Sequence, residues 1–386
     1  KMRGIIWTEI SQNSVLRGGN AQMRRKNSTS LDLRKTKPIP SPKQIRSPLT
    51  RSVPIRKWSW NELGTRLPKF SGCSMLPALQ KVNEKNAWVT LGSFFGSRAY
   101  YYSGGISSPN KAFKNGSRLS VHLAWGTISL RSIFSQLELK RNELDEENGR
   151  ALWKRSLRAF ESRLYWRDHF IQRLESVSDM EVRVLNRAYE NLEYEDNPEL
   201  LDSWLAGQTG YPMVDACMRC LNETGFMNFR MRAMLVSFAC FGLHLSWRTI
   251  HKPLARLFTD YEPGIHLSQI QMQAGVIGIN ALRVYSPSKQ FLDHDPTAQF
   301  VKRWVPELVN RTPVEIAHAE ECNIPEYIRP IVNQSVRSKK MKDQIYLIRK
   351  SDEGRLQSSK TLQTHGSQKK IPRKIKPKNN GQLELF

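Results

Sequence analysis

The chain has 386 residues, of which 39% are hydrophobic and 9% aromatic, so it can bury one large core or two ordinary ones. Its formal net charge of +25 lies mostly at the two ends, because residues 1–60 carry a net charge of +12 and residues 335–386 carry +10. No apolar run reaches 18 residues and no signal-peptide pattern is found, which excludes a membrane-spanning protein; two basic tails on a nearly neutral body are typical of a protein that binds a polyanion.

The chain divides into three predicted parts. Residues 1–57 are rich in Arg, Lys, Ser and Pro without apolar periodicity, which predicts a basic, disordered segment. Residues 58–335 show helical periodicity and form the predicted globular domain. Residues 336–386 are expected to form one more helix, at about 337–356, and then a basic tail. Since no run of alternating strands and no strand–helix–strand rhythm occurs, the predicted fold is mainly α.

Apolar spacing and helix caps place the helices of the domain in chain order. A helix is expected at 87–95, and the turn-rich residues 100–109 are expected to form a loop. Another helix begins near Ser117, breaks at Gly126 and restarts with Ser129 as its cap. Long helices are then predicted at 151–174, 197–205, 212–222, 228–245 and 251–258.

A Cys-x-x-Cys pair, Cys217 and Cys220, raises the question of a redox couple or a metal site. A redox motif of this kind follows a strand and a zinc site needs a second ligand pair, and the sequence shows neither. The two cysteines share a helix face with Met213, Ala216 and Leu221, which predicts core packing. Five cysteines in all, an odd and sparse set, favour a reducing, bacterial-type cytoplasm over a disulfide framework.

Two stretches combine arginine with groups that suit nucleotides. NGSRLS, residues 115–120, places two hydroxyls and Arg118 at a helix start, where backbone N–H groups and the helix dipole favour a phosphate; an ordinary Ser-rich cap is the alternative. RLYWRDHF, residues 163–170, interleaves Arg163, Trp166 and Arg167. That pattern suits a stacked base beside a phosphate, and its alternative is an amphipathic surface helix with a packed Trp.

Two later stretches add further arginines and a pair of carboxylates. GFMNFRMR, residues 225–232, places Arg230 and Arg232 just inside a helix. TDYEPGIHLSQIQMQAG, residues 259–275, places Asp260 and Glu262 beside His266 in a predicted loop with Pro and Gly. Two carboxylates near arginines are most simply structural salt bridges, and the residues alone leave that alternative open.

The motifs SRLSVHLAWGTISLR, RLYWRDHF, WLAGQTGYPMVDACMRCLNETGFMNFRMR, LSWR, DYEPGIHLSQIQMQAG and RVYSPSKQ occur in this order over about residues 87–310. Together they closely resemble the FAD-binding helical domain of the DNA photolyase/cryptochrome family, and in particular its short members without an antenna domain. The resemblance implies a helical cavity that holds U-shaped, non-covalent FAD. In that family the excited, reduced flavin passes an electron to a flipped-out pyrimidine dimer, which then splits.

The resemblance also implies roles at matching positions. Arg232 and Asp260 would pair beside the isoalloxazine ring, with Glu262 near its pyrimidine edge, and His266 stands where the family keeps an Asn facing flavin N5. The residues expected to hold the FAD phosphates and ribose are Tyr102, Gly116, Ser117, Arg118, Leu119 and Ser120.

On the DNA side of the site, Trp166 would stack on the lesion, Arg230 would hold a phosphate and Gln290 would close the lesion pocket. The full set of DNA-binding residues expected from the resemblance is Arg163, Trp166, Arg167, Asn228, Phe229, Arg230 and Gln290.

The sequence departs from the family pattern at three points. Arg163 stands where enzymes that repair cyclobutane dimers keep a Glu that binds the thymine edge, and a cation accepts no hydrogen bond. Trp247 matches the middle and Tyr194 the outer position of the electron chain that reduces the flavin, but residues 260–290 contain no Trp for the inner position. The short basic segment before the flavin region predicts no antenna chromophore.

The C-terminal sequence GQLELF resembles the pentapeptide by which bacterial DNA polymerases and repair proteins bind the β sliding clamp. Leu383, Leu385 and Phe386 would enter an apolar groove, and Gln382 would fix the register. The alternative is a tail that is apolar by chance.

Three functions remain open at this point. The first is a monomeric, nucleoid-associated enzyme that repairs UV-induced pyrimidine dimers in DNA with light, with single-stranded DNA as one candidate substrate. The second is a cryptochrome-like flavin photoreceptor that binds DNA without repairing it, which Arg163 and the broken Trp chain favour. The third is a helical DNA-binding module without flavin.

Overall fold

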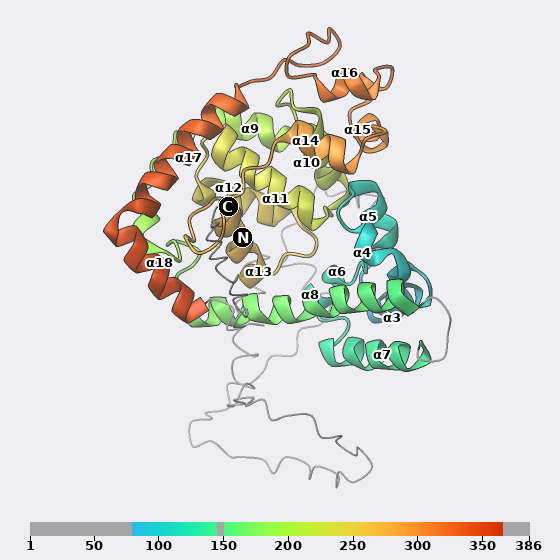
Figure 1. The fold of residues 1–386 in the computed structure, drawn as a ribbon. Helices are drawn as coiled ribbons and strands as arrows, with labels where there is room; N and C mark the ends of the chain where they lie inside the picture. The colour runs from blue at the N-terminus through green and yellow to red at the C-terminus, as the bar shows by residue number, and fades with distance from the viewer. Residues whose placement is uncertain (1–78, 145–149, 366–386) are drawn as a thin grey trace, which may run out of the picture. The chain divides into compact units, whose positions relative to one another are not determined.

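A computed structural model describes residues 79–144 and 150–365 (Figure 1). These residues form helices and connecting turns without a strand, so the mainly α prediction is confirmed. None of the helices described is both long and apolar enough to cross a lipid bilayer. The predicted disordered segment 1–57 and the end of the basic tail lie outside the described residues.

The first group of helices surrounds a small apolar core built from Phe94, Phe95, Tyr102 and Phe160. The expected loop at 100–109 is wrong, because a 3-10 turn and two short helices occupy this stretch. Ser129 caps a helix as predicted, since its hydroxyl accepts from the Ser132 N–H at 3.0 Å. The elements of this group are α3 (Glu84–Gly96), η2 (Arg98–Tyr101), α4 (Tyr102–Gly105), α5 (Pro109–Asn115), α6 (Ser120–Ala124), α7 (Leu130–Glu143) and α8 (Arg150–Ser176).

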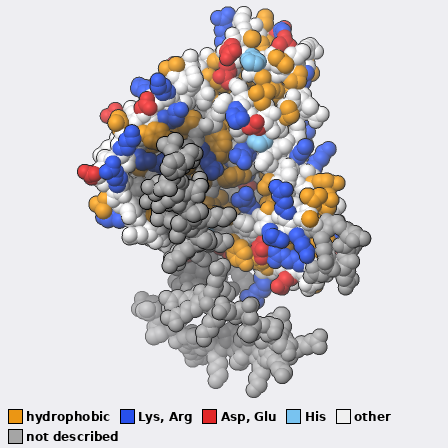
Figure 2. Space-filling view, in the orientation of Figure 1, with side chains coloured by type: hydrophobic (Ala, Val, Ile, Leu, Met, Phe, Trp, Pro, Cys, Tyr) orange, Lys and Arg blue, Asp and Glu red, His pale blue; other side chains and the backbone are white. Residues whose placement is uncertain are grey.

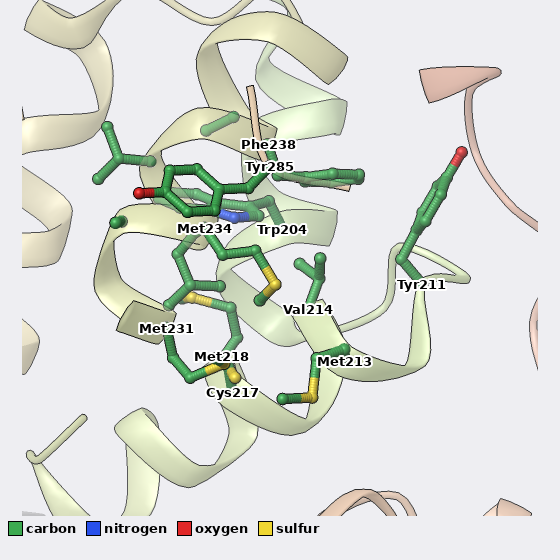
Figure 3. Close-up of a cluster of buried hydrophobic side chains, with 14 of the residues drawn as sticks. Trp204, Tyr211, Met213, Val214, Cys217, Met218, Met231, Met234, Phe238 and Tyr285 are labelled. Carbon is green, nitrogen blue, oxygen red and sulfur yellow. The ribbon is translucent and has the colours of Figure 1, made fainter. Parts of the chain in front are cut away.

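The second group contains the larger core (Figure 3). Its central helix α10 (Pro212–Thr224) buries Cys217 and Cys220 completely beside Met213, Met218 and Trp204. Burial raises the pKa of both thiols, and no cluster of metal-ligating residues occurs within the described chain. The core-packing prediction for the Cys-x-x-Cys pair is therefore confirmed.

Three predicted boundaries in this group are wrong. The helix expected at 228–245 is α11 (Phe229–Ser237), followed by one π turn at Phe238–Gly242. The helix expected at 251–258 begins earlier, as α12 (Trp247–Leu257), because the Ser246 hydroxyl accepts from the Arg248 N–H and caps it. The helix expected near 337–356 is two helices that meet at Ser351, α17 (Gln334–Lys350) and α18 (Asp352–His365).

The loop expected around His266 is instead a helix, α13 (Pro263–Gln273). Pro263 occupies its first turn, where a missing N–H costs nothing, and the Glu262 carboxylate caps the free N–H groups of Gly264 and Ile265. The remaining helices are α9 (Pro198–Ala206), α14 (Pro287–His294), α15 (Gln299–Trp304) and α16 (Pro313–Ala317).

Helix α8 joins the two groups, as the long helix at the bottom of Figure 1 shows. Its N-terminal half packs on α4 and η2, and its C-terminal half packs on α13. Gly264 makes the second contact possible, because a Cβ there would lie 2.6 Å from the Phe170 carbonyl oxygen and 2.8 Å from Ile171 Cα. This close approach brings the Trp166 segment of α8 next to the start of α13.

Candidate functional site

A buried ion pair joins α11 to the turn before α13. Arg232 donates from one guanidinium nitrogen to both oxygens of Asp260, at 3.0 and 2.9 Å, and from Nε to the Met227 carbonyl at 2.6 Å. Its guanidinium lies 4.1 Å from the centre of the Phe258 ring. Burial alone would raise the pKa of Asp260, but the charge of Arg232 and hydrogen bonds from Arg232 and Ser120 outweigh burial and hold the pKa below its usual value. The pair is therefore ionised and fixed in orientation.

The expected phosphate loop at 116–120 is held from outside by Arg98. The Arg98 guanidinium donates to the carbonyl oxygens of Gly116, Ser117 and Thr90. With these carbonyls turned toward Arg98, the loop is braced from one side. A cavity of about 640 Å³ borders the loop, and its cationic lining residues are Arg98, Lys114 and Arg118.

Arg118 is the strained residue of this loop. Its φ of 58° lies in the left-handed region, which a residue with a side chain adopts at a cost and mostly at functional sites. The guanidinium stacks 3.6 Å from the centre of the Phe226 ring and is within electrostatic reach of Asp260. Burial lowers the pKa of Arg118 to about 10, and its Nη1 has no hydrogen-bond partner among the described residues.

His266 lies on the buried side of α13. Its Nε2 donates to the His251 carbonyl oxygen at 2.9 Å, and its ring meets Tyr261 edge to face at 5.2 Å. Burial lowers the pKa of His266 to about 3. At neutral pH the ring is therefore uncharged, with its proton on Nε2 and a lone pair on Nδ1 that can accept a hydrogen bond.

Glu262 caps α13 and is also one of the residues predicted to lie beside the flavin. Its side chain accepts from the N–H groups of Gly264 at 3.3 Å and Ile265 at 2.8 Å. Burial raises the pKa of Glu262, while these two N–H groups and the charge of Arg167 act in the opposite direction. The carboxylate is consequently held in one place by the helix that it caps.

The expected lesion-binding residues gather where α8 passes the start of α13. Trp166 is 44% exposed and stacks on Phe170 with ring centres 5.5 Å apart. Arg163 lies 5.9 Å from the Phe229 ring centre. Burial raises the pKa of Tyr102 to about 12, and the nearby Arg163 acts against this rise through its charge and a hydrogen bond. Arg163 thus bridges a predicted FAD ligand and a predicted DNA ligand.

The remaining DNA-side residues lie at the start of α11 and in α14. Asn228 donates to the carbonyls of Ile106 and Ser107 at 3.0 and 2.9 Å, which attaches the start of α11 to the first group of helices. Gln290 is buried in α14, the helix that also carries His294. Burial, and then the charge of Arg230, lower the pKa of His294, so Arg230 and α14 face each other.

Of the two expected electron-chain residues, Trp247 is fully buried and Tyr194 is partly buried. Trp247 opens α12, its ring centre lies 6.0 Å from that of His251, and the Arg248 guanidinium lies 4.7 Å above it. Burial raises the pKa of Tyr194 well above its usual value, and Arg248 opposes this rise, so Tyr194 is a neutral phenol near the same arginine. His251 and His266 occupy the space between Trp247 and Asp260.

Six buried polar atoms at these positions have no hydrogen-bond partner within the part of the chain that the structure describes. They are Arg118 Nη1, Asn228 Oδ1, Arg230 Nε, Trp247 Nε1, Gln290 Oε1 and the Tyr194 hydroxyl. An unpaired buried polar atom costs about 1–3 kcal/mol, so such atoms are usually paired with water or a ligand. Together with the cationic cavity beside residues 116–120, they fit a large polar ligand that carries phosphate.

Several residues that shape the site had no role in the prediction from the sequence. Arg98 belongs to no motif, and Phe226 lies in GFMNFRMR without a predicted role; their contacts with the 116–120 loop depend on the tertiary fold. Phe258 and Met227, which fix Arg232, could have been suspected only from their nearness in sequence to the predicted ligands. The clamp-binding residues predicted at Gln382–Phe386 lie outside the described residues.

Comparison with known proteins places this geometry in a family. Residues 160–346 match the model of the FAD binding domain of DNA photolyase. The deoxyribodipyrimidine photo-lyase of Halobacterium salinarum is 31% identical over 233 residues, which cover 57% of this chain and 47% of that protein. Cryptochrome DASH of Synechocystis is 32% identical over 224 residues, covering 55% of this chain and 43% of the relative. The chain thus spans about half the length of the curated relatives it matches.

Solved structures agree with the sequence comparison. A photolyase of Sulfolobus tokodaii with two FAD molecules superposes with a TM-score of 0.59 at 29% identity, over 69% of this chain and 56% of that one. A cryptochrome of Synechocystis superposes with a TM-score of 0.62 at 26% identity, over 68% and 55% of the two chains. The family model and the solved structures thus match this chain to the helical FAD-binding domain of the photolyase/cryptochrome family.

Proposed function

We propose that this protein binds FAD non-covalently and uses light to repair UV-induced pyrimidine dimers in DNA. The observation that carries the proposal is that one fold joins two sets of groups. The ionised Arg232–Asp260 pair and neutral His266 lie on the buried side, and the exposed Trp166 with several arginines lies where α8 meets α13. The first set suits a buried flavin and the second suits an extruded base.

On the flavin side, the hydroxyl and backbone groups of Gly116–Ser120 and Tyr102 would hold phosphates and ribose. Arg98 fixes the loop from behind, since it binds the carbonyls of Gly116 and Ser117. The Arg232–Asp260 pair and the Nδ1 lone pair of His266 would orient the ring by hydrogen bonding. FAD, when bound and reduced, supplies light absorption and the electron that splits a dimer.

On the DNA side, Trp166 offers an exposed indole on which an extruded base can stack, held in place by its contact with Phe170. Arg167 and Arg230 would bind the neighbouring phosphates, and the amide of Gln290 would meet the base edge. Extrusion of a damaged base costs less than extrusion of a paired one, so the stacking platform also contributes selectivity.

A second candidate function is a flavin photoreceptor that binds DNA without repairing it, and Arg163 is the observation that favours it. The guanidinium is engaged by Tyr102 and Phe229 and has no acceptor to offer a thymine edge. Repair that depended on a carboxylate at this position would then be lost, whereas light absorption and DNA binding would be kept.

Repair and stacking are tested with UV-irradiated oligothymidylate and the FAD-loaded, reduced protein. We expect dimers, measured by chromatography, to disappear under blue light and to persist in the dark. Cyclobutane and (6-4) photoproducts are scored separately, and if both persist under light, the repair proposal is rejected in favour of the photoreceptor.

Substitution of the stacking residue tests the lesion site itself. Trp166→Ala should weaken binding of irradiated oligonucleotide by about 1–3 kcal/mol, the usual contribution of stacking one base on an aromatic ring. Trp88→Ala is the matched control, because Trp88 on α3 is also 44% exposed but lies outside the site. Equal affinities of the two variants in a fluorescence anisotropy titration would show that Trp166 does not stack on the lesion.

A further inference from the structure

Helix α8 carries its carboxylates on one side. Its three carboxylates, Glu161, Asp168 and Glu175, are seven residues apart, so they lie on one side of the helix. Glu161 accepts from Arg141 of α7 at 2.6 Å, which shows that this side faces α7. No carboxylate of α8 is left for its opposite side.

A neighbouring face of α8 carries a row of residues at helical spacings of three and four. Arg155, Arg158, Ser162 and Trp166 are all exposed, and we call these four residues the α8 row. Neither Arg155 nor Arg158 forms an ion pair or a hydrogen bond with another described residue. Two free guanidinium groups therefore precede the predicted stacking residue on one face.

A cavity marks the cationic end of the α8 row. Its volume is about 550 Å³, and its lining residues are Ala151, Lys154, Arg155 and Arg158. Three of these four residues are cations and none is acidic. In Figure 2, Lys and Arg side chains gather at the lower right of the molecule, over the region where α7 and the N-terminal half of α8 lie in Figure 1.

We propose that the α8 row is the path of a single DNA strand that leaves the lesion site at Trp166. The inference rests on the proposed function, because Trp166 sets the starting point of the path. The twelve residues from Arg155 to Trp166 span about 16 Å of helix, which corresponds to roughly three to five nucleotides of one strand.

A single strand fits this surface better than a duplex. A row of cations that ends in exposed aromatic rings follows one backbone and stacks its bases, which is how proteins bind single strands. Tyr165, next to Trp166 in the helix, is 60% exposed and provides a second ring at the same end. A single straight row offers nothing to the second backbone of a duplex.

The test measures binding of UV-irradiated oligothymidylates of 12 and 4 nucleotides by fluorescence anisotropy at several salt concentrations. The variant Arg155→Gln/Arg158→Gln should bind the 12-mer on the order of tenfold more weakly at 0.1 M salt, with a salt slope lower by about 1.4, since each lost phosphate contact in a single strand contributes about 0.7. Its affinity for the 4-mer should fall less, because two of the four nucleotides form the dimer at Trp166 and the other two reach no farther than Arg158, so at most one phosphate contact is lost.

Lys339→Gln/Lys350→Gln is the matched control, since it removes the same charge from the exposed side of α17. If this variant and Arg155→Gln/Arg158→Gln bind the 12-mer with the same affinity and slope, the proposed path is wrong. Displacement of the 12-mer by polyglutamate at equal charge concentration would also overturn it, in favour of an acidic protein partner.

The outcome separates this inference from the function on which it rests. If Trp166→Ala weakens binding of the irradiated 4-mer while the arginine variant behaves like the lysine control, the lesion site stands and the path fails. If the arginine variant loses affinity for the 12-mer and Trp166→Ala has no effect on either strand, the surface binds DNA but the lesion site is wrong.

Discussion

Asp260 is the residue on which the ligand side of the site depends most. Its side chain is 6% exposed and that of Arg232 is 26% exposed, so each compensates a charge that is largely removed from water. Removal of one member of a buried pair leaves the other uncompensated, which costs far more than the pair contributes. Exposed ion pairs elsewhere in the chain contribute little to stability, so the loss of one partner there costs little.

Asp260→Asn should therefore lower the free energy of unfolding by about 2–3 kcal/mol, at the lower end for buried pairs because Arg232 retains some solvent contact. It should also reduce the ratio of FAD to protein after purification. Glu307→Gln, which breaks the more exposed Arg219–Glu307 pair, is expected to cost less than about 1 kcal/mol. Urea unfolding of both variants compares the two costs, and equal losses would argue against a special role for the buried pair.

His266 makes the stability of the protein depend on pH. The folded protein keeps this ring neutral down to a pKa of about 3, whereas an unfolded chain binds the proton below a pH of about 6.5. Between these values the unfolded state binds more protons, so stability falls as the pH falls, by about 1.4 kcal/mol per pH unit for each such histidine. His251, whose burial lowers its pKa to about 4, adds to the effect.

His266→Gln should reduce the slope of unfolding free energy against pH by about 1.4 kcal/mol per unit between pH 6 and pH 4. The amide can still donate to the His251 carbonyl, so the fold is kept. His318→Gln, at an exposed position, should leave the slope unchanged. A wild-type slope in His266→Gln, measured on apo-protein by urea unfolding, would mean that the ring is not held neutral.

At the scale of helices, the position of Trp166 depends on how closely α13 approaches α8. Gly264 leaves no space for a Cβ against the α8 backbone at Phe170 and Ile171. Backbone atoms of a packed helix move less readily than the end of a side chain, so added volume here shifts the whole of α13.

Gly264→Ala should consequently lower the free energy of unfolding by about 2–3 kcal/mol. It should also weaken binding of damaged DNA through the displaced α8. Gly92→Ala on α3 serves as the control, because nothing lies within 4 Å of its Cβ position, and it should raise stability by about 0.5–1 kcal/mol. Thermal unfolding of the two variants checks both signs, and a neutral Gly264→Ala would contradict the close packing of α8 and α13.

Helix boundaries show what could be predicted from the sequence. Ser129 and Pro212 begin helices as their cap and first-turn preferences predict. The loop predicted around Pro263 is a helix, because a first-turn Pro with a carboxylate cap starts a helix as readily as it marks a loop. The break at Ser351 was missed, although residues 349–355 contain no apolar side chain and Ser351 precedes two acidic residues, which is a helix-start pattern.

The candidate site likewise contains contacts that could be predicted from the sequence and contacts that could not. Arg232 and Asp260 were predicted to pair, and they do. The bracing of the 116–120 loop by Arg98 and the stacking of Arg118 on Phe226 were not predicted, because these contacts join residues that are far apart in the sequence and have no motif in common. Local patterns predict caps and faces, whereas the partner of a buried cation is set by tertiary packing.

At the scale of the whole molecule, the described helices occupy the middle of a chain whose two ends carry most of its positive charge. The end of α18 is fixed to α8, because Arg173 of α8 donates to the His365 carbonyl oxygen at 3.3 Å. Arg173 is itself held by His169, one turn earlier in α8, at 2.8 Å. The last described residue, His365, therefore lies beside the helix that carries Trp166, as the meeting of α18 and α8 in Figure 1 shows.

The C-terminal QLELF sequence gives a prediction about partners, and we propose from its resemblance to clamp-binding pentapeptides that the tail binds the bacterial β sliding clamp. Leu383→Ala/Phe386→Ala should abolish clamp binding in a surface plasmon resonance assay, because both apolar anchors are removed. Photorepair of naked DNA by the same variant should be unchanged. Gln368→Ala is the control upstream in the tail, and clamp binding retained by the anchor variant would rule out this docking mode.

The central claim is that the helices from α4 to α14 hold a flavin. The absorption spectrum of the purified, full-length protein, recorded together with the amount of FAD released on denaturation, tests it most directly. We predict flavin bands and about one FAD for each chain, both before and after reconstitution of the apo-protein. A colourless protein that takes up no FAD when the cofactor is supplied in excess would contradict the account.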